Sequence, residues 1–191
     1  MADKQTPRRV PRRRFQAMII DFDRLVSSEV VVTDFDRSGC CAVGDGIDEM
    51  PETIGLTAKS IQGVIRGRIA WRRNGRAGIE FNWDNTARPD KRREKRVAVT
   101  IPAMIANEDG SKKLRCLIVD ASRSGCRIKA TGLDRLKEKI RLKIEKLAVP
   151  VSGRIVWRKD DTAGIELNWN FAQKAPGDME PPEEDGGRVF I

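Results

Sequence analysis

The chain has 191 residues, of which 39% are hydrophobic and 34% charged, and its formal net charge is +9. This length suits one ordinary domain or two small ones, and no apolar run approaches the roughly 20 residues that span a bilayer. The arginine-rich N-terminus lacks the apolar segment of a secretory signal, and the absence of histidine excludes the usual Cys/His zinc sites and the commonest general base.

Five segments are expected along the chain. Residues 1–14 form a basic N-terminal arm, and residues 15–83 form a first β-barrel. Residues 84–96 form a basic linker between domains, and residues 97–169 form a second barrel. Residues 170–191 form an acidic tail, which its Pro/Gly-rich composition predicts to be disordered.

Two barrels are predicted because the chain contains an internal repeat. At an offset of 86 positions, residues 15–83 align without a gap with residues 101–169, and 25 of the 69 aligned positions are identical. Arg37-Ser-Gly-Cys40 recurs as Arg123-Ser-Gly-Cys126, for example. Such a match indicates two copies of one domain.

Each copy is predicted to be all-β, because short β-branched or alternating segments are separated by turn residues at intervals of about 8–12 positions. The strands expected in the second copy are 97–107, 113–121, 126–130, 138–147, 149–157 and 162–168. Residues 133–147 also fit a helical period, but their counterpart 54–61 is a poor helix, so a strand after a helical turn is predicted. Trp157 and Trp169 are expected in the barrel core or at a barrel end, and the four cysteines are expected to be buried or half-buried.

Two motifs of the second copy carry a resemblance to a known family. Arg92-Arg-Glu-Lys-Arg96 precedes its first strand, and Asp120-Ala-Ser-Arg-Ser-Gly125 ends its second strand. In this order, and followed by Gly164-Ile-Glu-Leu-Asn-Trp169, they resemble the paired signature of the PilZ domain, R-x-x-x-R and [D/N]-x-S-x-x-G. The resemblance implies two tandem PilZ-like β-barrels of about six strands each, with basic lead-in segments.

The same resemblance implies cyclic di-GMP as the ligand, with no other cofactor and no metal. An arginine fork can donate two hydrogen bonds to a phosphate or to a guanine, and its face can stack on a purine. The carboxylate of Asp120 can accept hydrogen bonds from a guanine edge, and Asp120 and Ser122 fall on the same side of an extended chain. The ligand-binding residues implied by the resemblance are Arg92, Arg93, Arg96, Asp120, Ser122, Arg123 and Gly125.

The first copy departs from the pattern. Its loop has Asp36 where the motif has serine, which adds a negative charge beside the expected phosphates. Its arginines also lie two or three positions too close to the first strand, and Val10 occupies the position equivalent to Arg96. A weaker second site is therefore expected there, or a partner barrel that has lost the site. The residues concerned are Arg8, Arg9, Arg12, Arg13, Asp34, Asp36 and Gly39.

These observations favour a cytoplasmic cyclic di-GMP receptor or adaptor without membrane insertion. We expect no enzymatic activity, because no nucleophile–base pair is recognisable. Ligand binding is expected to change the orientation of the barrels and so to act on an unidentified downstream protein in motility, adhesion or polysaccharide production. One alternative is a nucleic-acid-binding barrel protein, which the basic arms favour and the low aromatic content, 5%, disfavours. Another is an adaptor that has lost ligand binding.

Overall fold

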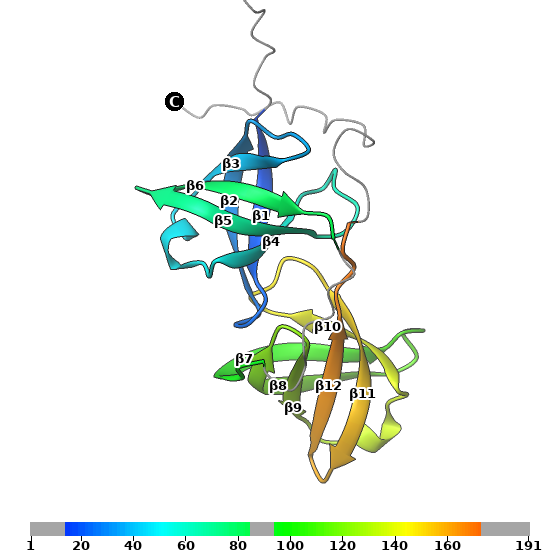
Figure 1. Ribbon diagram of the computed structural model, residues 1–191. Coiled ribbons are helices and arrows are strands. Elements are labelled where there is room, and N and C mark those ends of the chain that lie inside the picture. Colours follow the sequence, from blue (N-terminus) through cyan, green and yellow to red (C-terminus); the bar gives the residue numbers. More distant parts are fainter. Residues whose placement is uncertain (1–13, 85–93, 173–191) are drawn as a thin grey trace, which may run out of the picture.

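The computed structural model describes residues 14–84 and 94–172, which form two closed six-stranded β-barrels (Figure 1). Within these residues no helix is long and apolar enough to cross a membrane. Barrel 1 closes in the order β1-β2-β3-β6-β5-β4. Its strands are β1 (Phe15–Asp21), β2 (Val26–Thr33), β3 (Gly39–Val43), β4 (Thr53–Thr57), β5 (Ile65–Arg73) and β6 (Arg76–Asn82).

Barrel 2 repeats this topology and closes in the order β10-β11-β12-β9-β8-β7. Its strands are β7 (Val97–Asn107), β8 (Lys113–Ser122), β9 (Gly125–Lys129), β10 (Lys139–Ile144), β11 (Val151–Lys159) and β12 (Thr162–Asn168). The expected helical turn is a short 3-10 segment, Leu133–Arg135. The prediction of two small all-β barrels is therefore confirmed.

The exposed tryptophans correct one expectation. Trp157 is 44% exposed and lies over Gly164 on the next strand, where a Cβ would collide with the indole ring. Trp71 and Gly78 repeat this arrangement in barrel 1. Both tryptophans follow a register shift in their strand, which turns the ring outward onto the bare backbone of the glycine. Trp157 is thus an outer-face residue, whereas Trp169 is buried, as expected.

Several arginines occur at equivalent positions in both repeats and stabilise the structure of the barrels. Arg158 donates hydrogen bonds to the carbonyl oxygens of Leu133 and Leu136, which closes the 3-10 segment onto β11. Arg72 does the same in barrel 1. On the outer face, Arg154 pairs with Glu166 at 3.0 Å. These guanidinium groups therefore stabilise the barrels themselves.

The two barrels share apolar packing. The core of barrel 2 continues into Ile20, Phe22, Leu25 and Val64 of barrel 1. The Phe22 ring meets the Trp169 ring edge-to-face, with centroids 4.8 Å apart, and is 1% exposed. The interface is therefore a small hydrophobic core built from both repeats.

Backbone hydrogen bonds also join the barrels. Ser27, in β2, donates its N–H to the carbonyl oxygen of Lys146, and its hydroxyl oxygen accepts from the N–H of Ala148. Beyond β12, the chain runs up to barrel 1 (Figure 1), where Val64 and Phe171 form a parallel β-bridge. Residues 170–172, which the sequence places in the acidic tail, thus belong to the interface; residues 173–191 lie outside the described part of the chain.

The cysteines are free thiols. Cys40, Cys116 and Cys126 are buried and Cys41 is half-buried, as expected. Burial raises the pKa of Cys116 to about 11 and that of Cys40 to about 12. At neutral pH these thiols are therefore protonated, small apolar core residues.

Candidate functional site

The site suggested by the motifs lies at the end of β8 in barrel 2, where the lead-in residues reach the barrel. Arg96 donates from Nη1 to Oδ1 of Asp120 at 2.6 Å. Arg127, on β9, forms an ion pair with the other carboxylate oxygen, with its Nε at 2.8 Å. The Asp120 side chain is 15% exposed, whereas the two arginines are 58% and 49% exposed. One carboxylate thus holds two largely solvent-accessible guanidinium groups on the same surface.

The lead-in segment is fastened to the loop by Glu94. Its Oε2 accepts two hydrogen bonds from Ser124, one from the backbone N–H at 3.0 Å and one from the hydroxyl at 2.5 Å. Glu94 lies between the two arginines of R-x-x-x-R, and Ser124 lies inside the D-x-S-x-x-G loop. The two motifs are therefore linked directly.

Two residues of the loop have local structural roles. Ser122 is 2% exposed, and its hydroxyl donates to the carbonyl oxygen of Gly125 at 3.3 Å, inside the β8–β9 turn. A Cβ on Gly125 would lie 2.7 Å from the carbonyl oxygen of Ile165, so glycine is required by the close approach of β12. Ser122 and Gly125 thus shape the turn that presents Asp120 and Arg123.

In the loop of barrel 1, the serine Ser38 donates its hydrogen bonds to a different carboxylate. Asp36 occupies the position of Ser122, and its Oδ1 accepts from the N–H and hydroxyl of Ser38 at 2.7 and 2.6 Å. These hydrogen bonds hold the pKa of Asp36 below its usual value. Ser38 is the counterpart of Ser124, so a carboxylate within the loop replaces the one that Glu94 supplies from the lead-in. The N–H and the hydroxyl of Ser38 thus have an acceptor within the loop itself.

The rest of the barrel 1 loop differs from that of barrel 2 in sequence and in backbone path. Cys41 stands where barrel 2 has Arg127, and β2 ends at Thr33, so that Asp34 leaves the strand with a positive φ of 53°. Phe35 replaces Ala121 and packs edge-to-face against Phe15 and Phe81, with centroids 5.3 Å away. The packing of this larger side chain among the other rings accompanies the departure of the backbone from the strand at Asp34. Gly39, like Gly125, meets the neighbouring strand closely.

Six of the predicted site residues lie outside the described part of the chain. They are Arg8, Arg9, Arg12, Arg13, Arg92 and Arg93. Conversely, the motifs do not include Arg127 or Glu94. The repeat offered a signal for both, because their counterparts in the degenerate copy are Cys41 and Arg8, which cannot make the same contacts.

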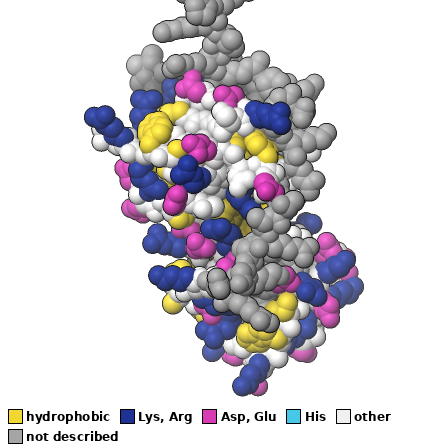
Figure 2. Space-filling view, viewed as in Figure 1, with side chains coloured by type: hydrophobic (Ala, Val, Ile, Leu, Met, Phe, Trp, Pro, Cys, Tyr) yellow, Lys and Arg dark blue, Asp and Glu magenta, His cyan; other side chains and the backbone are white. Residues whose placement is uncertain are grey.

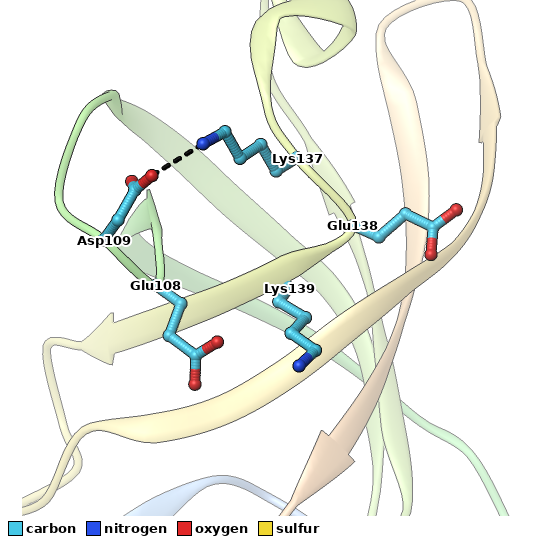
Figure 3. Close-up of a pocket in the computed structure, with 5 residues that line it drawn as sticks. All are labelled: Glu108, Asp109, Lys137, Glu138 and Lys139. Carbon is cyan, nitrogen blue, oxygen red and sulfur yellow. Dashed lines mark hydrogen bonds and ion pairs between the residues drawn. The ribbon is translucent and has the colours of Figure 1, made fainter.

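One hollow of the surface is poorly suited to an anionic ligand. A hollow of about 390 Å³ at the β7–β8 turn is lined by three acidic and two basic side chains, and Figure 3 shows Asp109 and Lys137 facing each other across it. That ion pair, at 2.7 Å, and the hydrogen bonds from Ser111 keep the pKa of Asp109 well below its usual value. Figure 2 shows basic and acidic side chains interspersed over the face in view. Among the described residues, no group of three His, Cys, Asp or Glu could hold a metal ion.

Comparison with known proteins gives both family and structural matches. The structure resembles the PlzA protein of Borreliella burgdorferi in complex with c-di-GMP, with 11% identity, 80% of each chain covered and a TM-score of 0.35. It also resembles Escherichia coli YcgR in complex with c-di-GMP, with 10% identity, 80% of this chain and 75% of that chain covered and a TM-score of 0.33. The Bacillus subtilis inhibitor of motility MotI/DgrA matches with 16% identity, 85% and 88% coverage and a TM-score of 0.30.

No curated protein sequence matches the chain. The PilZ domain family matches residues 90–178, which include all of barrel 2 together with the lead-in arginines. The family match and the motifs thus fall on the same copy of the repeat. The chain therefore contains a PilZ domain, which is barrel 2 with its lead-in residues.

Proposed function

We propose that this protein is a cyclic di-GMP receptor whose ligand site is the Arg96–Asp120–Arg127 surface of barrel 2, completed by Arg92 and Arg93. The observation that carries the proposal is the 2.6 Å contact between Arg96 and Asp120, which joins the last arginine of R-x-x-x-R to the first residue of D-x-S-x-x-G. A pair of exposed guanidinium groups beside a carboxylate suits a guanine nucleotide. The arginines can bind phosphate oxygens, and the carboxylate can accept from guanine N–H groups.

Asp120 has both carboxylate oxygens occupied in this structure. A guanine edge would therefore share or replace the contact with Arg96, which frees that guanidinium group for a phosphate or for stacking on the base. After this exchange Asp120 accepts from the guanine donors and Arg96 pairs with the phosphate, so both charged groups still have partners.

Barrel 1 is proposed to act as a partner barrel with a weak site or none. Asp36 uses its carboxylate within its own loop, and Asp34 lies outside the strand. No arginine takes the place of Arg127 there. The protein would act in the cytoplasm as an adaptor, not as an enzyme, and would pass the signal to a downstream protein through the orientation of the two barrels.

The proposal is tested by calorimetric titration of the full chain with cyclic di-GMP, with cyclic di-AMP and a DNA oligomer as controls. We expect saturable binding of cyclic di-GMP alone, because the adenine edge lacks the guanine donors that Asp120 would accept. Equal binding of the two dinucleotides would reject guanine reading. Binding of DNA alone would support the nucleic-acid alternative.

A second test addresses the link between the motifs. Glu94→Gln keeps the shape of the side chain but weakens its charge-assisted hydrogen bonds to Ser124, so Arg96, two residues further on, is held less firmly beside the loop. We expect about a 3- to 10-fold loss of cyclic di-GMP affinity. Glu108→Gln, on the same barrel and away from the loop, is the control. If the two variants bind alike, Glu94 has no positioning role.

A further inference from the structure

A hollow of about 780 Å³ lies on the outer face of barrel 1, across β1 and β2. Its floor contains Met18 of β1, Val31 of β2 and Val43 of β3. Val31 pairs with Val43, and Met18 lies on the diagonal from Val31 across the β1–β2 ladder, so the three side chains are neighbours on one face. Met18 and Val31 are half-buried, and Val43 is 37% exposed. This apolar floor suits an apolar side chain from another segment.

The hollow lies beside an open edge of β1. β4 pairs with β1 over three positions, and this ladder stops at Met18 and Thr57. The equivalent ladder of barrel 2 has five positions and continues one residue farther, to Ala103. In the described part of the chain, no strand pairs with residues 15–17 on the β4 side. Such an edge can accept an extended segment as an additional strand.

The repeat shows that the barrel fold does not require this surface. Val43 corresponds to Lys129 in barrel 2, and Glu29, on the rim of the hollow, corresponds to Arg115. Barrel 1 therefore has an apolar and an acidic side chain at two positions where barrel 2 has basic ones. Because the two barrels have the same topology, these differences are particular to the surface of barrel 1.

The described part of the chain ends on barrel 1, close to the hollow. Ala172 donates its N–H to the carbonyl oxygen of Val64 at 2.9 Å and belongs to the core of barrel 1. Val64 follows the β4–β5 connection, whose residues 58–60 line the hollow. The hydroxyl of Thr57 donates to the carbonyl oxygen of Gly63 at 2.9 Å, so the two ends of this connection lie together. Residues 173–191 thus start beside the hollow.

These remaining residues include a short apolar segment. Val189-Phe-Ile191 follows an acidic stretch, Glu183-Glu-Asp185, and is preceded by Arg188. β-Branched and aromatic residues favour an extended strand, in which Arg188 and Phe190 point to the same side. Residues 173–187 can span roughly 50 Å when extended, which is ample to bring this segment to the hollow.

We propose that residues 188–191 dock in the hollow of barrel 1, as a short strand added to the open edge of β1. Phe190 covers the apolar floor, and Arg188 lies beside the carboxylate of Glu29. Lys59, the basic residue of the rim, then faces the acidic stretch that precedes the segment. The hollow is thus a docking surface for the chain's own segment, independent of cyclic di-GMP binding.

Amide hydrogen exchange and NMR relaxation of the full chain, without nucleotide, test the proposal. In the wild type we expect residues 188–191 to be more ordered than residues 176–182, and the amides of residues 15–17 to be protected. Phe190→Ser removes the ring that covers the floor and leaves the described barrels unchanged. We expect exchange at residues 15–17 to become about 10-fold faster in this variant, and residues 188–191 to lose their order.

A charge exchange then tests the pairing of Arg188 with Glu29. Glu29→Arg gives barrel 1 the residue that barrel 2 has at the equivalent position, so the fold should tolerate it. We expect Glu29→Arg and Arg188→Glu each to accelerate exchange at residues 15–17 by about 2- to 5-fold, and the double variant to restore the wild-type rate. Glu52→Arg, an exposed position before β4, is the control and should change the rate by less than about twofold.

Several outcomes would overturn the inference. In the wild type, residues 188–191 would be as mobile as residues 176–182, or the double charge variant would exchange no more slowly than the single ones. Protection of residues 15–17 that survives deletion of residues 183–191 but is lost on deletion of residues 1–13 would assign the edge to the N-terminal arm. Protection that increases with protein concentration would assign it to a second copy of the chain.

Discussion

Arg96→Ala is expected to reduce the affinity for cyclic di-GMP by about 2–4 kcal/mol, or roughly 30- to 800-fold. The substitution removes a guanidinium group that is 58% exposed and is held on Asp120, and therefore ready to bind an anionic ligand. Among the described residues it leaves Asp120 paired with Arg127 alone, so the expected loss comes from the missing guanidinium group and not from Asp120. Titration calorimetry of the full chain measures the change directly.

Lys95→Ala is the matched control for that prediction. Lys95 is the preceding residue, is exposed and carries the same charge. If general basicity of the lead-in attracts the ligand, the two variants should weaken binding equally, by a small amount that disappears at high salt. If Arg96 binds the ligand directly, its loss persists at high salt. Wild-type affinity in Arg96→Ala would reject the assignment of the site.

The architecture was accessible from the sequence because the repeat and the strand pattern agree. The predicted bounds of β7 and β12 are those of the structure. The helix–strand ambiguity of residues 133–147 was resolved by comparison with the first copy, whose glycine and β-branched residues disfavour a helix. Two copies of one fold carry more information than a single sequence, since each position is observed twice.

The geometry of the site was less accessible, because it depends on contacts between distant positions. Alternation along an extended chain predicts that Asp120 and Ser122 share a side, but it does not reveal that Ser122 is buried in the turn. A register shift in β7 and another in β8 lie beside Asp120, and such irregularities leave no reliable mark in a single sequence. The role of Glu94 likewise requires knowledge of where the lead-in meets the loop.

The junction between the barrels was the largest departure from a sequence-based picture. The sequence divides the chain into two barrels, a basic linker and a separate acidic tail. The structure instead shows a shared core and a bridge between Val64 and Phe171. Any reorientation of the barrels on ligand binding would have to break or slide these contacts. Trp169 links the junction to the motif loop, because it contacts both Phe22 and the carbonyl oxygen of Arg123.

Phe22→Ala is expected to lower the free energy of unfolding by about 3–5 kcal/mol and to separate the unfolding of the two barrels. The ring is 1% exposed, packs against Trp169 and Phe171, and lies so close to Gly55 that a Cβ there would come within 2.7 Å of it. Its removal leaves a cavity in the only core cluster that contains residues of both barrels, within the described residues. Scanning calorimetry of the wild type should show one transition, and that of the variant should show two.

The effect of the ligand on the unfolding temperatures then shows whether the two barrels unfold together. A ligand that binds only the folded state stabilises every part of the molecule that unfolds with its site. Saturating cyclic di-GMP should therefore raise the single transition of the wild type, but only the barrel 2 transition of Phe22→Ala. Phe35→Ala is the control, because Phe35 packs within barrel 1 and its counterpart in barrel 2 is already alanine. If Phe22→Ala still unfolds in one transition that the ligand raises as a whole, the apolar junction does not couple the barrels, and the backbone bonds of Ser27 and Val64 must hold them together.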